Sequence, residues 1–333
     1  MLRLQIRAAV LLLGALLVAR PELIAAPRGP VAAMYADDQT RGKAIPQGFA
    51  AVSLPASADA PSAAQIYLTT GDLQRAFDNA RFRPGAAIIP TNTELQLTAK
   101  APATQQVLVD RVRKQADVMR ALQQQVDARR ARSSGAAGQA GALEVGVDTF
   151  VVKLSGGGSR PAAGAYPPTV CLLATDFAQG GAIDRRELFA QDRFRKGIAT
   201  CLGALESAGV ESLVVPLVGA ASSGVQKSDP QYEGQRVLME CRMINAVAGI
   251  ALGIHDFSPS RRNLREIGII QWERDILDMF GATRGAPLSN AAQSAFQAYM
   301  GQIKLALRNG LAGQKTTASD ISGSCGTIFN AQS

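Results

Sequence analysis

A run of small residues after an apolar segment is the part of the sequence best suited to binding chemistry. Residues 213–217 are apolar, with one proline among them, and are followed by Gly219, Ala220, Ala221, Ser222, Ser223, Gly224 and Val225. A loop of small side chains between a buried strand and a helix lets main-chain N–H groups approach phosphate oxygens. The run therefore predicts a phosphate-binding loop. The alternative is a close-packed turn in which the glycines only relieve crowding.

Other chemistry has little support in the sequence. His255 is the only histidine, and Asp256 adjoins it in sequence, which is not the spatial arrangement of a Ser/His/Asp triad. We therefore expect His255 to cap or pack at the end of an apolar helix. No CxxC or Cys/His spacing is present, so a metal site is not expected. No cofactor is expected either. Four carboxylates, whose spatial pairing the sequence leaves open, are interpreted as caps and surface residues: Asp176, Asp184, Glu187 and Glu273.

The amino-acid composition limits the kinds of molecule that the protein is expected to bind. The chain has 333 residues, of which 47% are hydrophobic and 19% charged, so a sizeable core is expected. Of the formal net charge of +8, four arginines and one glutamate in residues 1–36 account for +3, which leaves a mild +5. Aromatic residues make up only 5%, so stacking of single-stranded nucleic acid is not expected. Nucleic acid is therefore not an expected partner.

The N-terminus has the pattern of a targeting segment. Arg3 and Arg7 precede the apolar run of residues 8–19, which is too short to cross a hydrocarbon core as a helix. A basic start, a short apolar run and small residues after it predict a secretory signal within residues 1–36. The alternative is an uncleaved inner-membrane anchor over residues 8–26. We expect an exported protein, periplasmic or secreted, with a flexible linker over residues 37–64.

Strands and helices alternate along the rest of the chain. Strands are expected over residues 66–70, 86–91, 149–154, 169–174, 212–218 and 264–272. Helices are expected over residues 103–132, 184–208, 232–252 and 290–307, with a polar tail closing the segment 284–333. A Gly/Pro-rich connection without a helix predicts that strands 149–154 and 169–174 are antiparallel. The pattern predicts a three-layer α/β/α sandwich with a mixed central sheet.

The cysteines fall within these expected elements. Cys171 lies in a strand and Cys201 and Cys241 on apolar helix faces, where buried free thiols are common, whereas Cys325 lies near the C-terminus. An exported protein can equally pair its cysteines. The sequence leaves their disulfide status open.

Four short motifs in this order resemble the macro domain, an ADP-ribose-binding α/β/α module. They are GDL at 71–73, AIIPTNTEL at 87–95, PLVGAASSGV at 216–225 and IGIIQW at 267–272, and the resemblance covers residues 65–283. The resemblance implies that Asp72 contacts adenine and Asn92 lies near a ribose. It also implies that Gly219 to Val225 surround a diphosphate and that Trp272 forms a wall beside the adenosine. The plainer alternatives are a turn or cap role for Asp72 and Asn92, and a packing role for Trp272.

Departures from the macro-domain pattern affect the expected activity. Hydrolytic members carry a glycine-rich stretch soon after the asparagine motif, whereas ELQLTAKAPATQ at 94–105 has no glycine. Asn92 stands alone, and Ala220 and Ala221 replace residues common in the phosphate loop. We therefore expect binding of ADP-ribose, a related nucleotide diphosphate or an ADP-ribosylated protein, without hydrolysis. The alternatives are an ADP-ribosyl hydrolase in which Asn92 positions a water, and an envelope interaction protein that has lost the nucleotide site.

Overall fold

The computed structural model describes most of the region that follows the N-terminal segment. The described residues are 29–41, 52–55, 63–71, 82–91, 114–133, 143–154, 169–175, 191–218, 232–280, 288–321 and 325.

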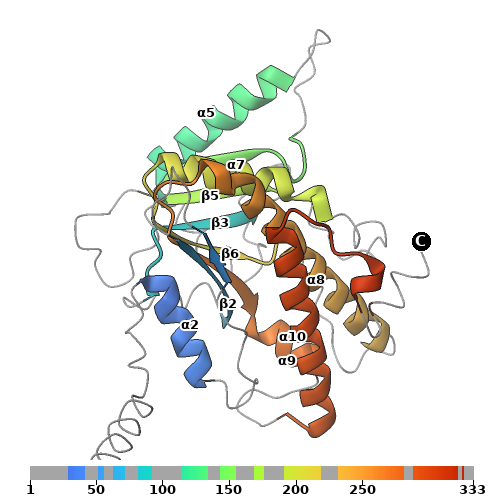
Figure 1. The fold of residues 1–333 in the computed structure, drawn as a ribbon. Helices are drawn as coiled ribbons and strands as arrows, with labels where there is room; N and C mark the ends of the chain where they lie inside the picture. Colours follow the sequence, from blue (N-terminus) through green and yellow to red (C-terminus); the bar gives the residue numbers. More distant parts are fainter. Residues whose placement is uncertain are drawn as a thin grey trace, which may run out of the picture.

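The core of the structure is a seven-stranded mixed sheet (Figure 1). Its strands are β1 (Val52–Leu54), β2 (Ala64–Gly71), β3 (Ala86–Thr91), β4 (Thr149–Lys153), β5 (Thr169–Ala174), β6 (Ser212–Pro216) and β7 (Glu266–Trp272). Their order across the sheet is β1-β2-β7-β6-β3-β5-β4. The five central strands are parallel, and β1 and β4 are antiparallel to their neighbours at the two ends.

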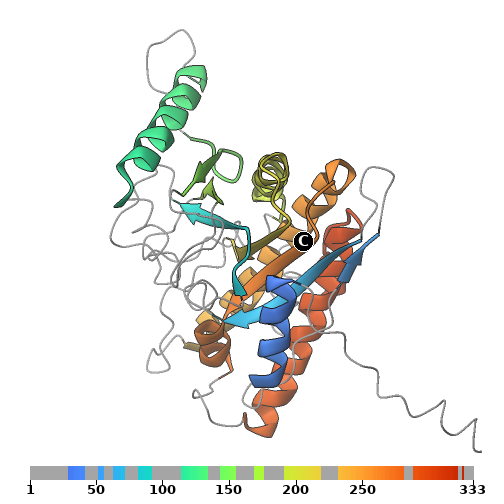
Figure 2. The same cartoon turned by 90° about the vertical axis from the view of Figure 1, so that its left-hand side faces the viewer.

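Helices cover both faces of this sheet. On one face lie α7 (Arg195–Ser207), α8 (Tyr232–Phe257), α9 (Glu273–Met279) and α10 (Asn290–Leu311), which build the larger apolar core. On the other face lie α2 (Pro30–Arg41) and α5 (Ala116–Ser133), which build a second core. Figure 1 shows α2 on one side of the sheet and α8 and α10 together on the other. In Figure 2, α5 stands at the end of the sheet that carries β4. The predicted three-layer architecture is confirmed.

Strand burial follows from the parallel pairing. All six residues of β3 and all six of β5 are buried. Alternate side chains point to opposite faces of a strand, so β3 places Ile88 in the larger core and Ile89 in the second one. These strands are apolar on both sides because helices lie over both sides.

Helix α8 is the central helix of the larger core. Residues Arg236–Ser260 are long and apolar enough to cross a membrane, but 78% of their most apolar stretch is buried inside the domain. A helix with apolar side chains on every face is stable in water only when other elements pack against every face. Here the sheet, α7 and α10 supply them.

The elements agree closely with those expected from the sequence. The strands predicted at residues 86–91 and 169–174 have these bounds in the structure, and β4 is antiparallel to β5 as expected. Helix α8 continues five residues beyond its expected end, to Phe257. Helix α5 is described only from Ala116, and its residues Val118, Leu122 and Val126 are buried against the second core.

The N-terminal boundary differs from the expected one. Helix α2 spans the boundary placed between residues 36 and 37, and Val31 is fully buried against Gly268 of β7. The main-chain N–H of Val31 donates to Glu266 Oε2 at 3.2 Å. Burial raises the pKa of Glu266, although its hydrogen bonds from α2 act in the opposite direction. The expected linker also contains β1, which pairs with β2.

The C-terminal helix belongs to the same core. Phe296, Tyr299, Ile303 and Leu307 of α10 are buried, and Phe280 stacks edge-on against Phe296 with ring centroids 5.4 Å apart. The boundary placed at residue 283 therefore does not separate two packed units, because α10 covers one side of α8.

All four cysteines form disulfides. Cys171 of β5 bonds to Cys201 of α7, and Cys241 of α8 bonds to Cys325 near the C-terminus. Their Cα atoms are 5.8 and 5.4 Å apart, within the usual range for disulfides. The pairing settles the question that the sequence left open.

Gly146 occupies a junction between β5 and the start of α7. Its N–H donates to Ala174 O at 2.8 Å, and its carbonyl accepts from Gly197 N at 2.8 Å. Its φ is +73°, and a Cβ placed there would overlap the carbonyl oxygen of Arg193. Both the backbone conformation and the close packing require glycine.

Gly146→Ala is expected to lower the free energy of unfolding by at least about 2 kcal/mol, because left-handed strain and steric overlap both oppose the methyl group. Chemical denaturation measures this loss. Gly203→Ala in α7 is the matched control, since a Cβ there meets no atom within 4 Å. That change is expected to leave stability equal or raise it by about 0.5–1 kcal/mol. Similar values for the two variants would contradict the prediction.

Candidate functional site at the carboxyl edge of the parallel strands

The carboxyl ends of the five parallel strands lie along one edge of the sheet. These strands are β2, β7, β6, β3 and β5, in that order. In open α/β sheets, ligands bind outside the carboxyl ends of the strands, where neighbouring connections leave to opposite faces. The strands β3 and β6 meet this condition. After β3 the chain goes to α5 on one face, and after β6 it goes to α8 on the other.

The pairing between β3 and β6 is confined to their amino ends. Ala86 is paired with Leu213 and Ala87 with Val214, and no further pair is present between these two strands. By contrast, β3 pairs with β5 along all six residues. Pro216 at the end of β6 has no N–H with which to continue a ladder. The two strands therefore stop pairing before they reach the carboxyl edge.

The predicted ligand residues follow directly from these strand ends. Asp72 follows Gly71 of β2, Asn92 follows Thr91 of β3, and Gly219 follows Val218 just after β6. The residues that lie outside the described part of the chain are Asp72, Asn92, Gly219, Ala220, Ala221, Ser222, Ser223, Gly224 and Val225. Their roles stay predictions. What the structure describes is that their preceding strands share one edge.

Trp272 is the last residue of β7, and its main chain pairs with Gly71 of β2. Its side chain lies outside the described part, so its predicted role as an adenosine wall also stays a prediction.

A threonine hydrogen bond fixes the end of β3. The main-chain N–H of Thr175 donates to Thr91 O at 2.6 Å, and Thr175 Oγ1 donates to the same carbonyl at 2.8 Å. Both threonines are buried. Because Thr91 immediately precedes Asn92, this double contact sets where the chain leaves the sheet. The sequence pattern did not single out Thr175, although it follows the apolar strand directly.

A buried phenol fixes the end of β7 in a similar way. Tyr299 of α10 is fully buried, and its hydroxyl donates to Gln271 Oε1 at 2.5 Å. Burial raises the pKa of Tyr299 well above its ordinary value, and the nearby Glu240 and Asp275 add to this effect. The phenol is therefore a neutral donor that holds the residue before Trp272. It was missed because residues 284–333 were assigned to a separate segment.

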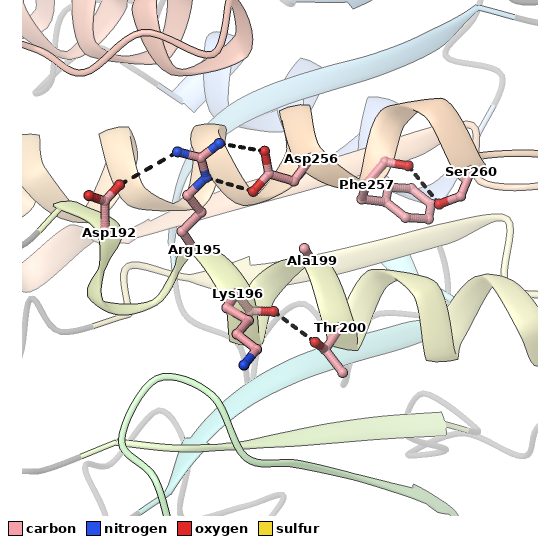
Figure 3. A pocket seen from close by; sticks show the side chains of 8 residues that line it. All are labelled: Asp192, Arg195, Lys196, Ala199, Thr200, Asp256, Phe257 and Ser260. Carbon is pink, nitrogen blue, oxygen red and sulfur yellow. Dashed lines mark hydrogen bonds and ion pairs between the residues drawn. The ribbon is translucent and has the colours of Figure 1, made fainter.

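A second feature, an open hollow of about 480 Å³, lies between α7 and the end of α8 (Figure 3). Arg195 donates from Nε and Nη2 to both carboxylate oxygens of Asp256 at 2.6 Å, and it also lies 3.6 Å from Asp192. Lys315 forms a further ion pair with Asp192. The hydrogen bond from Arg195 lowers the pKa of Asp256. These four charges neutralise one another.

His255 has the packing role expected of it. Its Nδ1 lies 3.0 Å from Leu311 O, and because a carbonyl only accepts, Nδ1 carries the proton. Asp256 is bonded to Arg195 and not to the imidazole. Within the described residues there is no group of three or more His, Cys, Asp or Glu side chains that could hold a metal ion. Asp176, Asp184 and Glu187 lie outside the described part, as does the side chain of Glu273.

Comparison with known proteins gives a likeness to solved structures alone. No family model matches the chain, and no curated protein sequence matches it. Among solved structures the chain is similar to a mutant macrodomain of Oceanobacillus iheyensis, with 9% sequence identity and a TM-score of 0.39. The alignment covers 76% of this chain and 98% of that one. This likeness concerns the overall course of the chain and assigns no residue role.

Thr175→Val is expected to lower the free energy of unfolding by about 1 kcal/mol, because the buried hydroxyl bond to Thr91 is lost while the volume is kept. Thr69→Val is the matched control. Thr69 is equally buried, and its hydroxyl has no hydrogen-bond partner in the described structure. Its replacement is therefore expected to be neutral or stabilising. Denaturation of the two variants giving equal losses would contradict the role of Thr175.

Proposed function

We propose that this chain is an exported macro-like domain that binds ADP-ribose or a related nucleotide diphosphate at the carboxyl edge, without catalysis. The observation that carries the proposal is the switch between β3 and β6, whose chains leave to opposite faces and whose pairing ends early. Such a switch point is where open α/β sheets place their ligands. It lies between the strands that lead to Asn92 and to the loop of residues 219–225.

The order of strands along the edge supports a ligand of this chemistry. From one side, the strand ends lead to Asp72 (β2), Trp272 (β7), the loop 219–225 (β6) and Asn92 (β3). The roles implied by the macro-domain resemblance then read adenine, adenosine, diphosphate and ribose. This is the order of the groups in ADP-ribose itself. Three strand spacings of about 4.8 Å separate β2 from β3, so the edge suits an elongated ligand better than a compact ion.

The lack of catalysis rests on the departures from the hydrolytic pattern. Residues 94–105 contain no glycine to hold a substrate and a water closely, and Asn92 is the single asparagine of its motif. A phosphate-binding loop is sufficient for binding, because its main-chain N–H groups donate hydrogen bonds to the phosphate oxygens. It supplies no group that transfers a proton.

The proposed export is supported by the cysteines as well as by the N-terminal pattern. Disulfides form and persist in oxidising compartments, and all four cysteines are paired. We place the end of the targeting segment before Gly29. A Cβ on Gly29 would overlap the carboxylate of Glu266, and Val31 is buried, so the first turn of α2 is part of the packed domain.

Calorimetric titration of the disulfide-bonded protein with ADP-ribose is expected to show binding of one ligand per chain. Gly224→Leu is expected to weaken this binding at least tenfold, because a bulky side chain blocks approach of the diphosphate to the main chain. Asn92→Ala tests the ribose contact, and Gly203→Ala in α7 is the control that should bind as the unaltered protein does.

Three results of this titration would contradict the proposal. The absence of heat and of any ligand-induced thermal shift would favour an envelope interaction protein. Release of ADP-ribose from a modified protein, lost in Asn92→Ala, would favour the hydrolase. Equal affinity in Gly224→Leu would remove the loop from the site.

The mature N-terminus of the exported protein tests the assignment of α2. Intact-mass measurement of protein recovered after export is expected to place the first residue at or before Gly29. A chain beginning at Asp37 is expected to have lower thermal stability than one beginning at Gly29, because it lacks the buried Val31 and most of α2. A stable mature protein that begins after Ala33 or Ala36 would contradict this assignment.

A further inference from the structure

Three exposed basic side chains lie at the amino edge of the sheet, which is the edge opposite the candidate site. The strands β2, β7, β6, β3 and β5 begin at this edge, and β4 ends there, because Lys153 pairs with Thr169, the first residue of β5. Arg265 directly precedes β7, and Arg262 lies shortly before it. Lys153, Arg262 and Arg265 are exposed, and in the described part of the chain none of their side chains has an ion pair.

Buried contacts hold the loop that carries the two arginines. The carboxylate of Glu206 accepts the main-chain N–H groups of Arg262 at 2.9 Å and Leu264 at 3.0 Å. The buried guanidinium of Arg261 donates to Leu264 O at 3.1 Å and to Pro55 O at 3.0 Å. Because the main chain is held from inside, the exposed side chain of Arg262 starts from a fixed position.

Positive charge exceeds negative charge on this edge. Among the described residues there, Glu211 is an exposed acid that directly precedes β6. Glu206 and Glu266 are buried, and their carboxylates accept main-chain N–H groups. The three exposed cations outweigh this carboxylate, and from β7 to β4 they spread over about 19 Å, the width of four strand spacings. An extended anionic surface therefore fits this arrangement better than a small anion.

The N-terminal segment joins the domain at the same edge. Gly29 lies against the carboxylate of Glu266, the first residue of β7. In the sequence, only Pro27 and Arg28 separate Gly29 from the candidate membrane segment of residues 8–26. The chain from residue 26 to Gly29 spans at most about 11 Å. A membrane that holds this segment therefore lies next to the amino edge.

We propose that the amino edge of the sheet is a lipid-facing surface, on which Lys153, Arg262 and Arg265 bind anionic phospholipid headgroups. This inference rests on the proposed export and not on nucleotide binding. Basic residues beside a membrane segment attract anionic lipids, with a gain of about fivefold in affinity for each residue near the surface. The carboxyl edge then faces away from the lipid, because β7 alone is about 20 Å long.

The position of the N-terminal segment favours a membrane over a soluble polyanion as the partner. A few exposed charge pairs give weak binding to a soluble polymer at physiological salt, because the charges are screened. A membrane segment close to Gly29 instead holds the same cations beside the headgroups at high effective concentration. A modest number of cations is then sufficient.

The test measures how fast a dicarbonyl reagent modifies individual arginines, read by mass spectrometry. The full-length chain is reconstituted into vesicles of phosphatidylcholine with or without phosphatidylglycerol. Phosphatidylglycerol is expected to slow modification of Arg262 and Arg265 at least fivefold, and high salt is expected to reverse this protection. Arg130 and Arg132 are the internal control, because they lie in the last turn of α5, where Arg129 bonds to Asp148 near the carboxyl edge. Their modification is expected to change by less than about twofold.

A pair of matched variants tests the same surface by binding. Arg262→Gln/Arg265→Gln is expected to weaken cosedimentation of the mature exported protein with vesicles that contain phosphatidylglycerol, at least fivefold in affinity. Arg130→Gln/Arg132→Gln removes the same charge and is expected to bind as the unaltered protein does. The modification experiment uses the unaltered chain, so it decides the proposal even if a variant fails to fold.

Three outcomes would overturn the lipid-facing surface. Arg262 and Arg265 could stay equally reactive on both kinds of vesicle, which would exclude contact with anionic headgroups. They could be protected equally without phosphatidylglycerol, which would leave charge without a role. All four arginines could be protected alike, which would show a general attraction and no particular surface. Protection of Arg262 and Arg265 alone, in a protein that binds no ADP-ribose, would support this surface while removing the proposed nucleotide site.

Discussion

Every side chain of β3 and β5 is buried, so helices must cover both faces of the sheet at its centre. The chain meets this requirement by sending its connections to opposite sides, with α5 over one face and α7 and α8 over the other. A parallel sheet covered in this way contains a position where neighbouring strands leave in opposite directions. Here the connection after β3 leaves to one face and those after its neighbours β6 and β5 leave to the other, and of these two pairs only β3 and β6 stop pairing early. The arrangement of the strand ends at the carboxyl edge is thus a consequence of how the core is packed.

Two buried polar contacts hold the strand ends at this edge. Thr175 fixes the carbonyl of Thr91, and Tyr299 fixes the side chain of Gln271. A buried polar atom that loses its partner costs more than the bond itself contributes, so such contacts keep their geometry. Both act on the residue next to a predicted ligand residue, without being ligands themselves. Their effect is to hold the ends of β3 and β7 in place.

The domain is larger than the unit outlined by its sequence motifs. Helix α8 is 26 residues long and buried on nearly all sides, and the sheet and α7 do not cover it completely. Helix α10 supplies the remaining cover, and Cys325 adds a covalent link to the same helix. At the other end of the chain, α2 fills the second face beside β7, where Gly268 leaves room for Val31. Both terminal elements are therefore part of the core.

Local patterns were enough to locate the central strands, because runs such as residues 86–91 and 169–174 are short, apolar and bounded by Gly or Pro-rich segments. The alternation of strands and helices likewise determined the three-layer class, and the motifs placed the predicted ligand residues just after strand ends. Apart from the β4–β5 pair, the tertiary structure alone decided which strands are neighbours. It also decided which cysteines pair and which terminal segments belong to the domain. These features depend on contacts between distant residues, such as Val31 with Glu266 across 235 positions and Cys241 with Cys325 across 84. A hydrophobic pattern records that a residue is buried, but it does not record which residue covers it.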